Sequence, residues 1–289
     1  MTAQEIDISV IVPFLNEADY IERCIESLLD QDIGRVPVEY IFVDNNSTDR
    51  SASIVSKYKK IKLLRENRRH VYVARNAAID RAKGRILAFT DADCIVSRNW
   101  LASILNEFDA RKVDILLGER HFSEKASYMA RFMEDYENLK IEYILHEKDY
   151  KKCFGYANNM AVRRSVYDRL GGFKEDVPLG DTELVIRYVA AHSTPKIGYS
   201  ASARISHMEI STWFGWLKKL ALYGKESPRS GIPLYMSWEK QVGLYRFCFG
   251  KSEYSLLESS LFFLTTLCAN AAYLVPYLIF GGRKLVVHE

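Results

Sequence analysis

Apolar runs alternate with segments of helical periodicity up to about residue 120. Residues 8–12 form a nearly unbroken apolar run that ends at Pro13, which is typical of a strand buried on both faces of a parallel sheet. Apolar residues then recur at helical spacing from Ile21 to Leu29, and we expect Asn16 to cap this helix. The alternation repeats, with strands expected at 38–43, 61–64 and 85–90 and helices at 49–59 and 71–83. It predicts an α/β fold with right-handed crossovers and a mostly parallel, doubly wound sheet flanked by helices.

The middle of the chain is less regular. We expect a long helix at 123–147, a strand at 158–162 followed by a short helix, a break at Gly171-Gly172, a helix at 181–192 and short strands within 196–206. These segments complete the predicted globular part. The sequence therefore predicts one large domain, 1–225, and a C-terminal helical extension, 226–289.

Aromatic and apolar residues dominate the chain beyond Ser211. One helical stripe carries Trp213, Phe214, Trp216, Leu217, Leu220 and Tyr223, with Lys218 and Lys219 off it, and this pattern predicts an amphipathic helix with interfacial aromatics. The 22 residues from Ser259 to Phe280 carry no charge, which is about the length needed to cross a bilayer. A membrane span, an in-plane or re-entrant anchor, and a core or docking helix are all compatible with this composition.

Charge and cysteine content narrow the partners and the compartment. The net charge of +3, from 40 basic and 37 acidic residues, does not indicate a nucleic-acid partner. The five cysteines lie far apart, without zinc-ligand spacing, and read as reduced and mostly buried thiols. Residues 1–7 are polar and acidic and lack the features of a secretory signal. We therefore expect the globular part to stay in the cytoplasm.

Polar residues follow three of the predicted strands. In an open parallel sheet the carboxyl ends of strands form the ligand site. Residues 13–17, 44–49 and 91–93 should therefore converge at one edge. Asp91 and Asp93 are placed to share a hard divalent cation, which prefers oxygen ligands. The alternative is a solvated acidic turn, or a cap for the helix that starts near Asn99.

Four motifs follow one another along the chain: Val12-Pro13-Phe14-Leu15-Asn16-Glu17, Val43-Asp44-Asn45-Asn46-Ser47-Thr48-Asp49, Ala74-Arg75-Asn76 and Phe89-Thr90-Asp91-Ala92-Asp93. In this order and spacing they resemble the motifs of family 2 glycosyltransferases with the GT-A fold. The resemblance extends over about residues 8–225 and includes the less specific segments 158–164, 171–173 and 180–183. It implies a transferase that takes a sugar from a nucleotide-sugar donor.

The resemblance also implies roles for single residues. Asp44 is similar to the carboxylate that recognises the base, Pro13 and Glu17 to residues that line the nucleoside pocket, and Arg75 to the residue that contacts the nucleotide or diphosphate. Asn16 and Asn46 belong to the same motifs and join the nucleotide-binding set. Asp91 resembles the ribose and sugar contact, and Asp93 the direct ligand of Mn2+ or Mg2+. Without the family pattern, Glu17 and Asp44 read as helix-turn and turn-capping acids.

The family inverts the anomeric carbon, which requires a base for the acceptor hydroxyl. Asp181 matches that base, although Gly180 stands where the family usually has Glu, and Glu183 is able to share or take the role. Asp181 is also a plausible helix N-cap. His207, near Arg204, resembles a histidine that some relatives bring to the metal or diphosphate, and the alternative is a structural histidine.

The resemblance limits the reaction without naming the substrates. The Gln-x-x-Arg-Trp motif of processive synthases is absent at Gln241 to Arg246, which favours transfer of a single sugar. UDP is the favoured carrier, GDP comes second, and the acceptor is a saccharide, a protein or a lipid-linked hydroxyl. Arg283 and Lys284 would place a single span's catalytic domain outside the cell, where sugar nucleotides are scarce. We therefore expect peripheral or re-entrant contact with the inner face of the cell membrane.

Two other classes remain as alternatives. A nucleotidyltransferase would have a glycine-rich loop after the first strand, whereas residues 13–17 contain no glycine. A non-catalytic, membrane-associated nucleotide-sugar-binding or scaffold relative is expected to lose its metal or base carboxylates, whereas Asp91, Asp93 and Asp181 are present.

Overall fold

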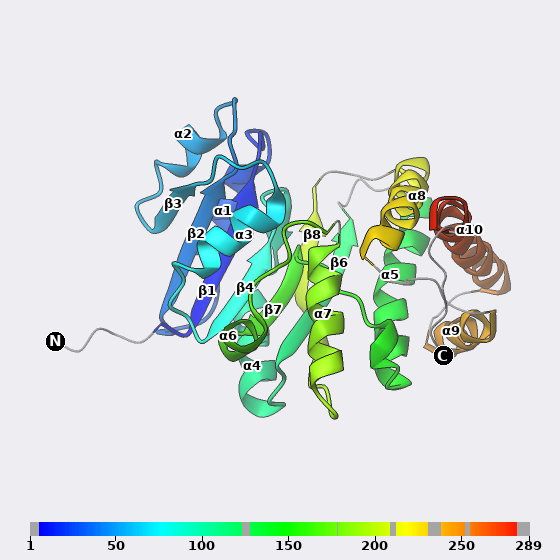
Figure 1. Ribbon diagram of the computed structural model, residues 1–289. Helices are drawn as coiled ribbons and strands as arrows, with labels where there is room; N and C mark the ends of the chain where they lie inside the picture. The colour runs from blue at the N-terminus through cyan, green and yellow to red at the C-terminus, as the bar shows by residue number, and fades with distance from the viewer. Residues whose placement is uncertain are drawn as a thin grey trace. The chain divides into compact units, whose positions relative to one another are not determined.

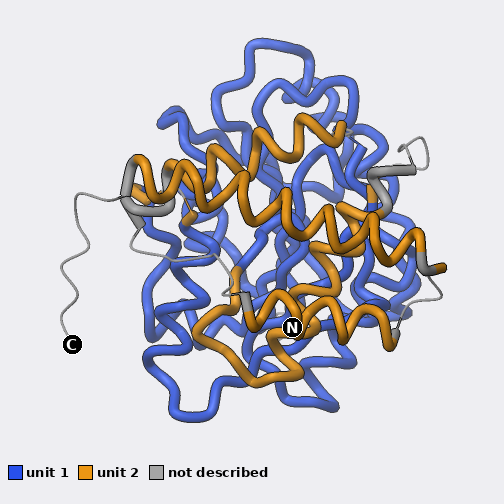
Figure 2. Tube along the Cα trace, turned by 90° about the vertical axis from the view of Figure 1, so that its right-hand side faces the viewer, with its two compact units in different colours: residues 1–121, 155–175, 180–209 blue, residues 122–154, 176–179, 210–289 orange. Residues whose placement is uncertain are grey.

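The chain forms two compact units in a computed structural model that describes residues 6–122, 128–177, 179–208, 212–230, 238–251 and 255–281. The sheet unit comprises Met1–His121, Gly155–Glu175 and Gly180–Glu209, and the helical unit comprises Phe122–Phe154, Asp176–Leu179 and Ile210–Glu289 (Figure 2). This division differs from the predicted boundary at 225/226. Residues 122–154 and 210–225 group with the C-terminal helices, because they share one apolar core with them.

The sheet unit is built on eight strands in the order β3-β2-β1-β4-β7-β6-β8-β5. Figure 1 labels each of these strands except β5. Their bounds are β1 Ile8–Phe14, β2 Val38–Asp44, β3 Ile61–Arg65, β4 Ile86–Thr90, β5 Cys94–Val96, β6 Ile115–Phe122, β7 Asn159–Arg163 and β8 Ile197–His207. The strands from β3 to β4 pair in parallel, as predicted. β7 is antiparallel to both β4 and β6, and β5 is antiparallel to β8, so the whole sheet is mixed. The α/β fold prediction is confirmed.

Helices connect the strands and cover the sheet. They are α1 Ile21–Leu29, α2 Ser51–Val55, α3 Val71–Ile79, α4 Trp100–Ala110, α6 Arg164–Leu170 and α7 Gly180–Ala191. All seven residues of β1 are buried, which fits a strand covered on both faces. The five cysteines are all free, and four of them are buried, as predicted, while Cys268 is exposed.

Some predicted element details are wrong. Asn16 does not cap α1, because that helix begins at Ile21 and its cap position, Tyr20, makes no side-chain cap hydrogen bond within the described chain. Asn16 instead takes a left-handed backbone conformation with φ 59°, which asparagine tolerates better than most residues. The helix expected at 49–59 shortens to α2, and the short strands expected within 196–206 merge into β8.

The helical unit consists of α5 Tyr128–His146, a short 3-10 turn Tyr150–Lys152, α8 Trp213–Ser230, α9 Trp238–Lys251 and α10 Leu256–Gly281. The helix expected at 123–147 corresponds to α5, and residues 123–127 lie outside the described part. The aromatic stripe predicted on α8 divides: Trp216 is buried in the unit's core, whereas Phe214 is 80% exposed. Within α10, Leu257–Ile279 is long and apolar enough to cross a membrane by length and composition, with 28% of it buried.

Gly84 permits β1 and the start of β4 to approach closely. A Cβ at Gly84 would overlap the backbone of Ile8 and Ser9, and its N–H donates to Ser9 Oγ at 2.8 Å. We expect Gly84→Ala to lower the free energy of unfolding by about 1–3 kcal/mol, because backbone atoms must shift to make room. Urea unfolding measures this change. Gly250→Ala is the control, since nothing lies within 4 Å of its Cβ position, and an equal loss in both variants would contradict the explanation.

Candidate functional site

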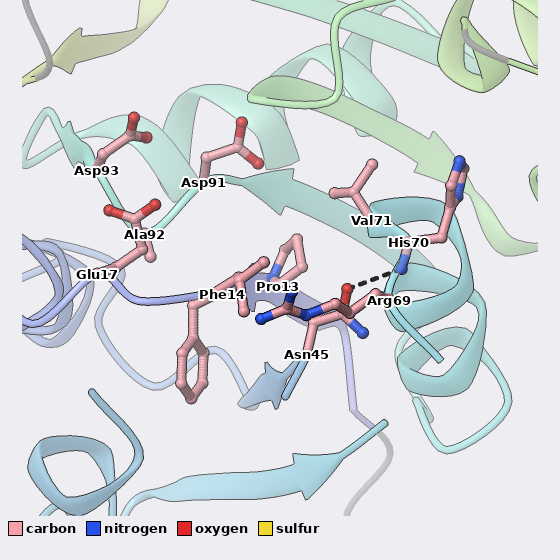
Figure 3. Close-up of a pocket in the computed structure, with 11 residues that line it drawn as sticks. Pro13, Phe14, Glu17, Asn45, Arg69, His70, Val71, Asp91, Ala92 and Asp93 are labelled. Atoms are coloured by element: carbon pink, nitrogen blue, oxygen red, sulfur yellow. Dashed lines mark hydrogen bonds between the residues drawn. The ribbon is translucent and has the colours of Figure 1, made fainter. Parts of the chain in front are cut away.

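A cavity of about 330 Å³ opens at the carboxyl ends of β1, β2 and β4 (Figure 3). Its lining comprises Pro13, Phe14, Leu15, Glu17, Asn45, Arg69, His70, Val71, Asp91, Ala92 and Asp93. Four of the residues predicted from the sequence, Pro13, Glu17, Asp91 and Asp93, therefore share one cavity. The edge is the one at which the sequence motifs were expected to converge.

Asn16, Asp44 and Asn46 lie outside that lining and shape the turns behind it. Asn16 Oδ1 accepts the Thr48 N–H at 2.7 Å, which ties the turn after β1 to the turn after β2. Asn46 has φ 72°, so asparagine suits the backbone there. Asp44 is 1% exposed, and its Oδ1 accepts the Ser47 N–H at 2.8 Å. Its Oδ2 lies 3.4 Å from Arg65 Nε and accepts no hydrogen bond within the described chain.

Sequence reasoning missed the loop after β3, which supplies Arg69, His70 and Val71 to the cavity. Asn45 holds this loop: its Nδ2 donates to the Glu66 and Arg68 carbonyls at 3.0 and 2.8 Å, and its Oδ1 accepts the His70 N–H at 3.0 Å (Figure 3). The carboxyl-end rule applies to β3 as well as to its neighbours. The run Arg68-Arg69-His70 at that end was the available signal.

Arg75 forms a buried ion pair with the first residue of the acidic triplet, Asp91-Ala92-Asp93. It lies on α3, is only 4% exposed, and contacts Asp91 Oδ1 through Nη2 at 2.6 Å. A buried guanidinium is costly unless it is paired, so this contact fixes both side chains. Arg75 thus reaches the site through Asp91 and does not line the cavity.

Asp93 faces His207 across the pairing of β5 with β8. His207 lies opposite Cys94 in the strand register, and its Nε2 is 3.3 Å from Asp93 Oδ2. Ligand atoms of Asp93, Cys94 and His207 all lie within 4.8 Å of one another. Burial raises the pKa of the Asp93 carboxyl, His207 opposes that shift, and the charge of Asp91 adds to it. A cation beside Asp93 would offset both the cost of burying the carboxylate charge and its repulsion from Asp91.

Asp181 lies in the first turn of α7 and is held at both oxygens. Oδ1 accepts from the Tyr72 hydroxyl at 3.0 Å and from the Thr182 N–H at 2.9 Å, and Oδ2 accepts from the Ala157 N–H at 3.0 Å. Burial and the charge of Asp181 raise the pKa of Tyr72 well above its usual value, so the phenol remains a donor. Tyr72 was not identified from the sequence, because nothing local links it to a residue on α7.

Glu183, two residues further along α7, is engaged by two cationic side chains. Lys174 Nζ lies 2.8 Å from Oε1 and Arg187 Nη2 lies 2.8 Å from Oε2. The side chain is also largely buried. Neither Asp181 nor Glu183 lines the cavity, and Tyr72 and Arg75 on α3 connect Asp181 with Asp91.

Asn45→Ala should free the loop after β3. The substitution leaves two carbonyls and one N–H without their partners, so we expect unfolding to become easier by about 1–3 kcal/mol. Hydrogen exchange at the His70 amide should speed up more than exchange in the β1 ladder. Asn67→Ala is the matched control, because Asn67 is exposed in the same loop. Unchanged exchange at His70 in Asn45→Ala would rule out this anchoring role.

Comparisons with known proteins agree with the sequence motifs. A profile of Glycosyl transferase family 2 matches residues 9–171, which is more than half of the chain. Glycosyltransferase AglE of Haloferax volcanii is 28% identical over 172 residues, which cover 57% of this chain and 55% of AglE. The chain spans about half or less of the length of the first curated relatives it matches.

Two solved structures share the fold. Mannosyltransferase PcManGT from Pyrobaculum calidifontis, in complex with GDP-Man and Mn2+, superposes with a TM-score of 0.62 at 19% identity, covering 99% of this chain and 77% of that one. S. aureus TarS 1-349 in complex with UDP-GlcNAc superposes with a TM-score of 0.58 at 17% identity, covering 98% of this chain and 93% of that one. The fold is of the GT-A type, and the chain belongs to glycosyl transferase family 2.

Proposed function

We propose that the protein is an inverting glycosyltransferase that moves one sugar from a nucleotide-sugar, with UDP-sugars favoured, to an acceptor hydroxyl. The main support for this proposal is the cavity at the carboxyl edge of the sheet, with Asp91 and Asp93 in its wall and His207 beside Asp93. PcManGT with GDP-Man and TarS with UDP-GlcNAc support a nucleotide-sugar donor as the class of ligand.

The nucleoside would occupy the part of the cavity between Pro13 and the loop after β3. Arg69 places a cation there, and Asn45 fixes the backbone that carries it (Figure 3). The Oδ2 of Asp44 pairs with Arg65 at 3.4 Å but accepts no hydrogen bond from a described residue, and it would accept an N–H from the base. Glu17 lies on the same side as the acidic triplet.

Asp93 and His207 would hold a divalent cation, Mn2+ or Mg2+. The carboxylate suits either ion, and the buried, crowded position of Asp93 favours a positive charge beside it. The cation supplies charge stabilisation to the departing diphosphate. Asp91 would contact the ribose or sugar through Oδ2, because Arg75 pairs with Oδ1.

Asp181 would act as the base. An ionised carboxylate has about four lone-pair sites, and three are used by Tyr72, Thr182 and Ala157, which leaves one for an acceptor hydroxyl. The hydroxyl proton passes to Asp181 as its oxygen forms the new bond to the anomeric carbon. The bond from that carbon to the diphosphate oxygen breaks on the opposite face. Glu183 is the weaker candidate, since Lys174 and Arg187 occupy its oxygens.

Nucleotide release tests the proposal directly. The purified chain is incubated with UDP-, GDP- and dTDP-sugars, with Mn2+, with Mg2+ or with EDTA, and released nucleoside diphosphate is measured. We expect release with one carrier and only with a cation. Asp93→Ala should lower the rate at least about 100-fold because charge stabilisation is lost. Asp181→Asn should lower it roughly 100- to 10,000-fold while donor binding persists.

Asp30→Ala, at the exposed end of α1, is the control for these variants. Calorimetry with each nucleotide separates a missing acceptor from a missing site. Binding of a nucleotide-sugar without turnover, over an acceptor panel of saccharides and lipid-linked hydroxyls, would favour the non-catalytic binding or scaffold relative. Absence of any nucleotide binding by the folded, cation-loaded chain would refute the donor site.

Tyr72→Phe tests whether the phenol positions Asp181. We expect kcat to fall roughly 10-fold and KM for the donor to stay unchanged, because the lost hydrogen bond orients the base and not the nucleotide.

The same substitution in an Asp181→Asn background provides the control. Tyr72→Phe should have little further effect there, because its partner no longer acts as a base. A loss of rate as large as in the wild-type background would assign Tyr72 a general structural role.

The acceptor and the location belong to the same proposal. The extended apolar helix α10 favours a lipid-linked hydroxyl or a growing glycan at a membrane as acceptor, with the enzyme peripheral on the cytoplasmic face.

A further inference from the structure

The helix α10 exposes a long uncharged stripe. Exposed positions recur every three or four residues, at Leu257, Ser260, Leu264, Cys268, Ala271, Val275 and Leu278. Leu257 is 71% exposed, and Leu264, Val275 and Leu278 are each 54% exposed. At 1.5 Å per residue the stripe extends over about 30 Å. Scattered exposed apolar residues are ordinary, but a contiguous stripe of this length marks an interaction surface.

The opposite face of α10 is already used. Phe262, Thr265, Thr266, Ala269 and Tyr273 are buried, and they face the core that α10 shares with α5, α8 and α9. The stripe is therefore not the part of α10 that stabilises the helical unit. It is left for a partner outside the described residues of that unit.

Lysines gather on α8 where it packs against the C-terminal half of α10. A Cβ at Gly224 would overlap the Tyr273 carbonyl, so the two helices are in close contact there. A groove of about 520 Å³ beside this contact is lined by Gly215, Lys218, Lys219, Ala221, Leu222, Lys225 and Pro276. All three lysine side chains are exposed, and Leu222 between them is 53% exposed.

We propose that this surface, the α10 stripe together with the lysine groove, docks the chain on a membrane rich in anionic phospholipid, with α10 lying in the plane of the interface. Apolar side chains enter the boundary between headgroups and acyl chains, and the ammonium groups pair with lipid phosphates. Pro276 joins the two parts, because it lines the groove and directly follows Val275 of the stripe. The inference deepens the proposed function by naming the surface and the lipid, and its evidence comes entirely from the helical unit.

The groove argues against a full span by α10. α8 packs along α10, and it carries Lys218, Lys219 and Lys225. Moving α10 through the hydrocarbon would carry these charges into the bilayer or strip α8 from its core, and either change is costly. An in-plane helix keeps the core intact and leaves the ammonium groups at headgroup depth.

The groove also argues against a second copy of the chain on the same surface. A symmetric dimer pairs a patch with itself, so six lysines would belong to one interface. None of the seven groove-lining residues is acidic. Anionic lipid would bring phosphate groups to this surface.

Vesicle co-sedimentation with the full-length purified chain tests the proposal. We expect binding to phosphatidylcholine vesicles that contain phosphatidylglycerol, and much weaker binding to phosphatidylcholine alone. Lys218→Gln, Lys219→Gln and Lys225→Gln together should weaken partitioning to the anionic vesicles on the order of 100-fold, at roughly fivefold per lysine. The control is the triple variant Lys57→Gln, Lys59→Gln and Lys60→Gln, which removes the same charge from exposed positions of the sheet unit.

The apolar part is tested separately. Leu264→Asp with Val275→Asp should abolish binding to either vesicle, whereas Leu63→Asp, on β3, should not. Thermal unfolding of the same preparations checks that the variants are folded. Their nucleotide binding should be unchanged, which shows that the substitutions affect membrane binding and not the donor site. The proposal would be overturned by equal binding to neutral and anionic vesicles or by unchanged binding of the lysine variant. It would also be overturned if salt and alkali failed to extract the bound chain, or if the chain formed a concentration-dependent dimer that Leu264→Asp with Val275→Asp abolished.

Discussion

The ion pair between Arg75 and Asp91 fixes the functional edge of the sheet. A guanidinium that is 4% exposed must have a counter-charge, so α3 docks where β4 ends. Once docked, the helix reaches other elements through side chains one turn apart. Tyr72 binds Asp181 on α7, and Asn76 exchanges two hydrogen bonds with the Phe173 backbone at 2.8 and 2.9 Å. A single helix of nine residues thus positions Asp91, Asp181 and the turn at Phe173.

In the first half of the chain, local sequence patterns were enough to predict the buried strands and several residues of the candidate site. The burial of β1 and the acids after β4 are read from a few consecutive residues, and the structure places Pro13, Glu17, Asp91 and Asp93 around one cavity. The antiparallel half of the sheet was not predicted. Residues 122–154, which belong to the helical unit, separate β6 from β7 in the sequence. The direction of β7 depends on the end of the sheet at which the chain returns from that segment, and hydrophobic periodicity does not indicate this.

The prediction failed where a side chain acts on a distant backbone. Asn16 looked like a helix cap by its position before α1, yet its oxygen serves the turn after β2. The α8 stripe looked continuous, yet packing with α5 and α10 buries Trp216 and leaves Phe214 outside. In both cases the residue type was informative, and the partner was decided by tertiary contacts that one segment cannot specify.

The Tyr72 ring occupies the space that a side chain at position 180 would need. A Cβ at position 180 would lie 2.9 Å from two carbons of the Tyr72 ring and 2.9 Å from the Lys174 carbonyl. A glutamate at 180, the residue that the family resemblance leads one to expect, would therefore require both the Tyr72 ring and the Lys174 carbonyl to move. The two positions are expected to change together among descendants of this chain, as a pair set by geometry and not by chemistry.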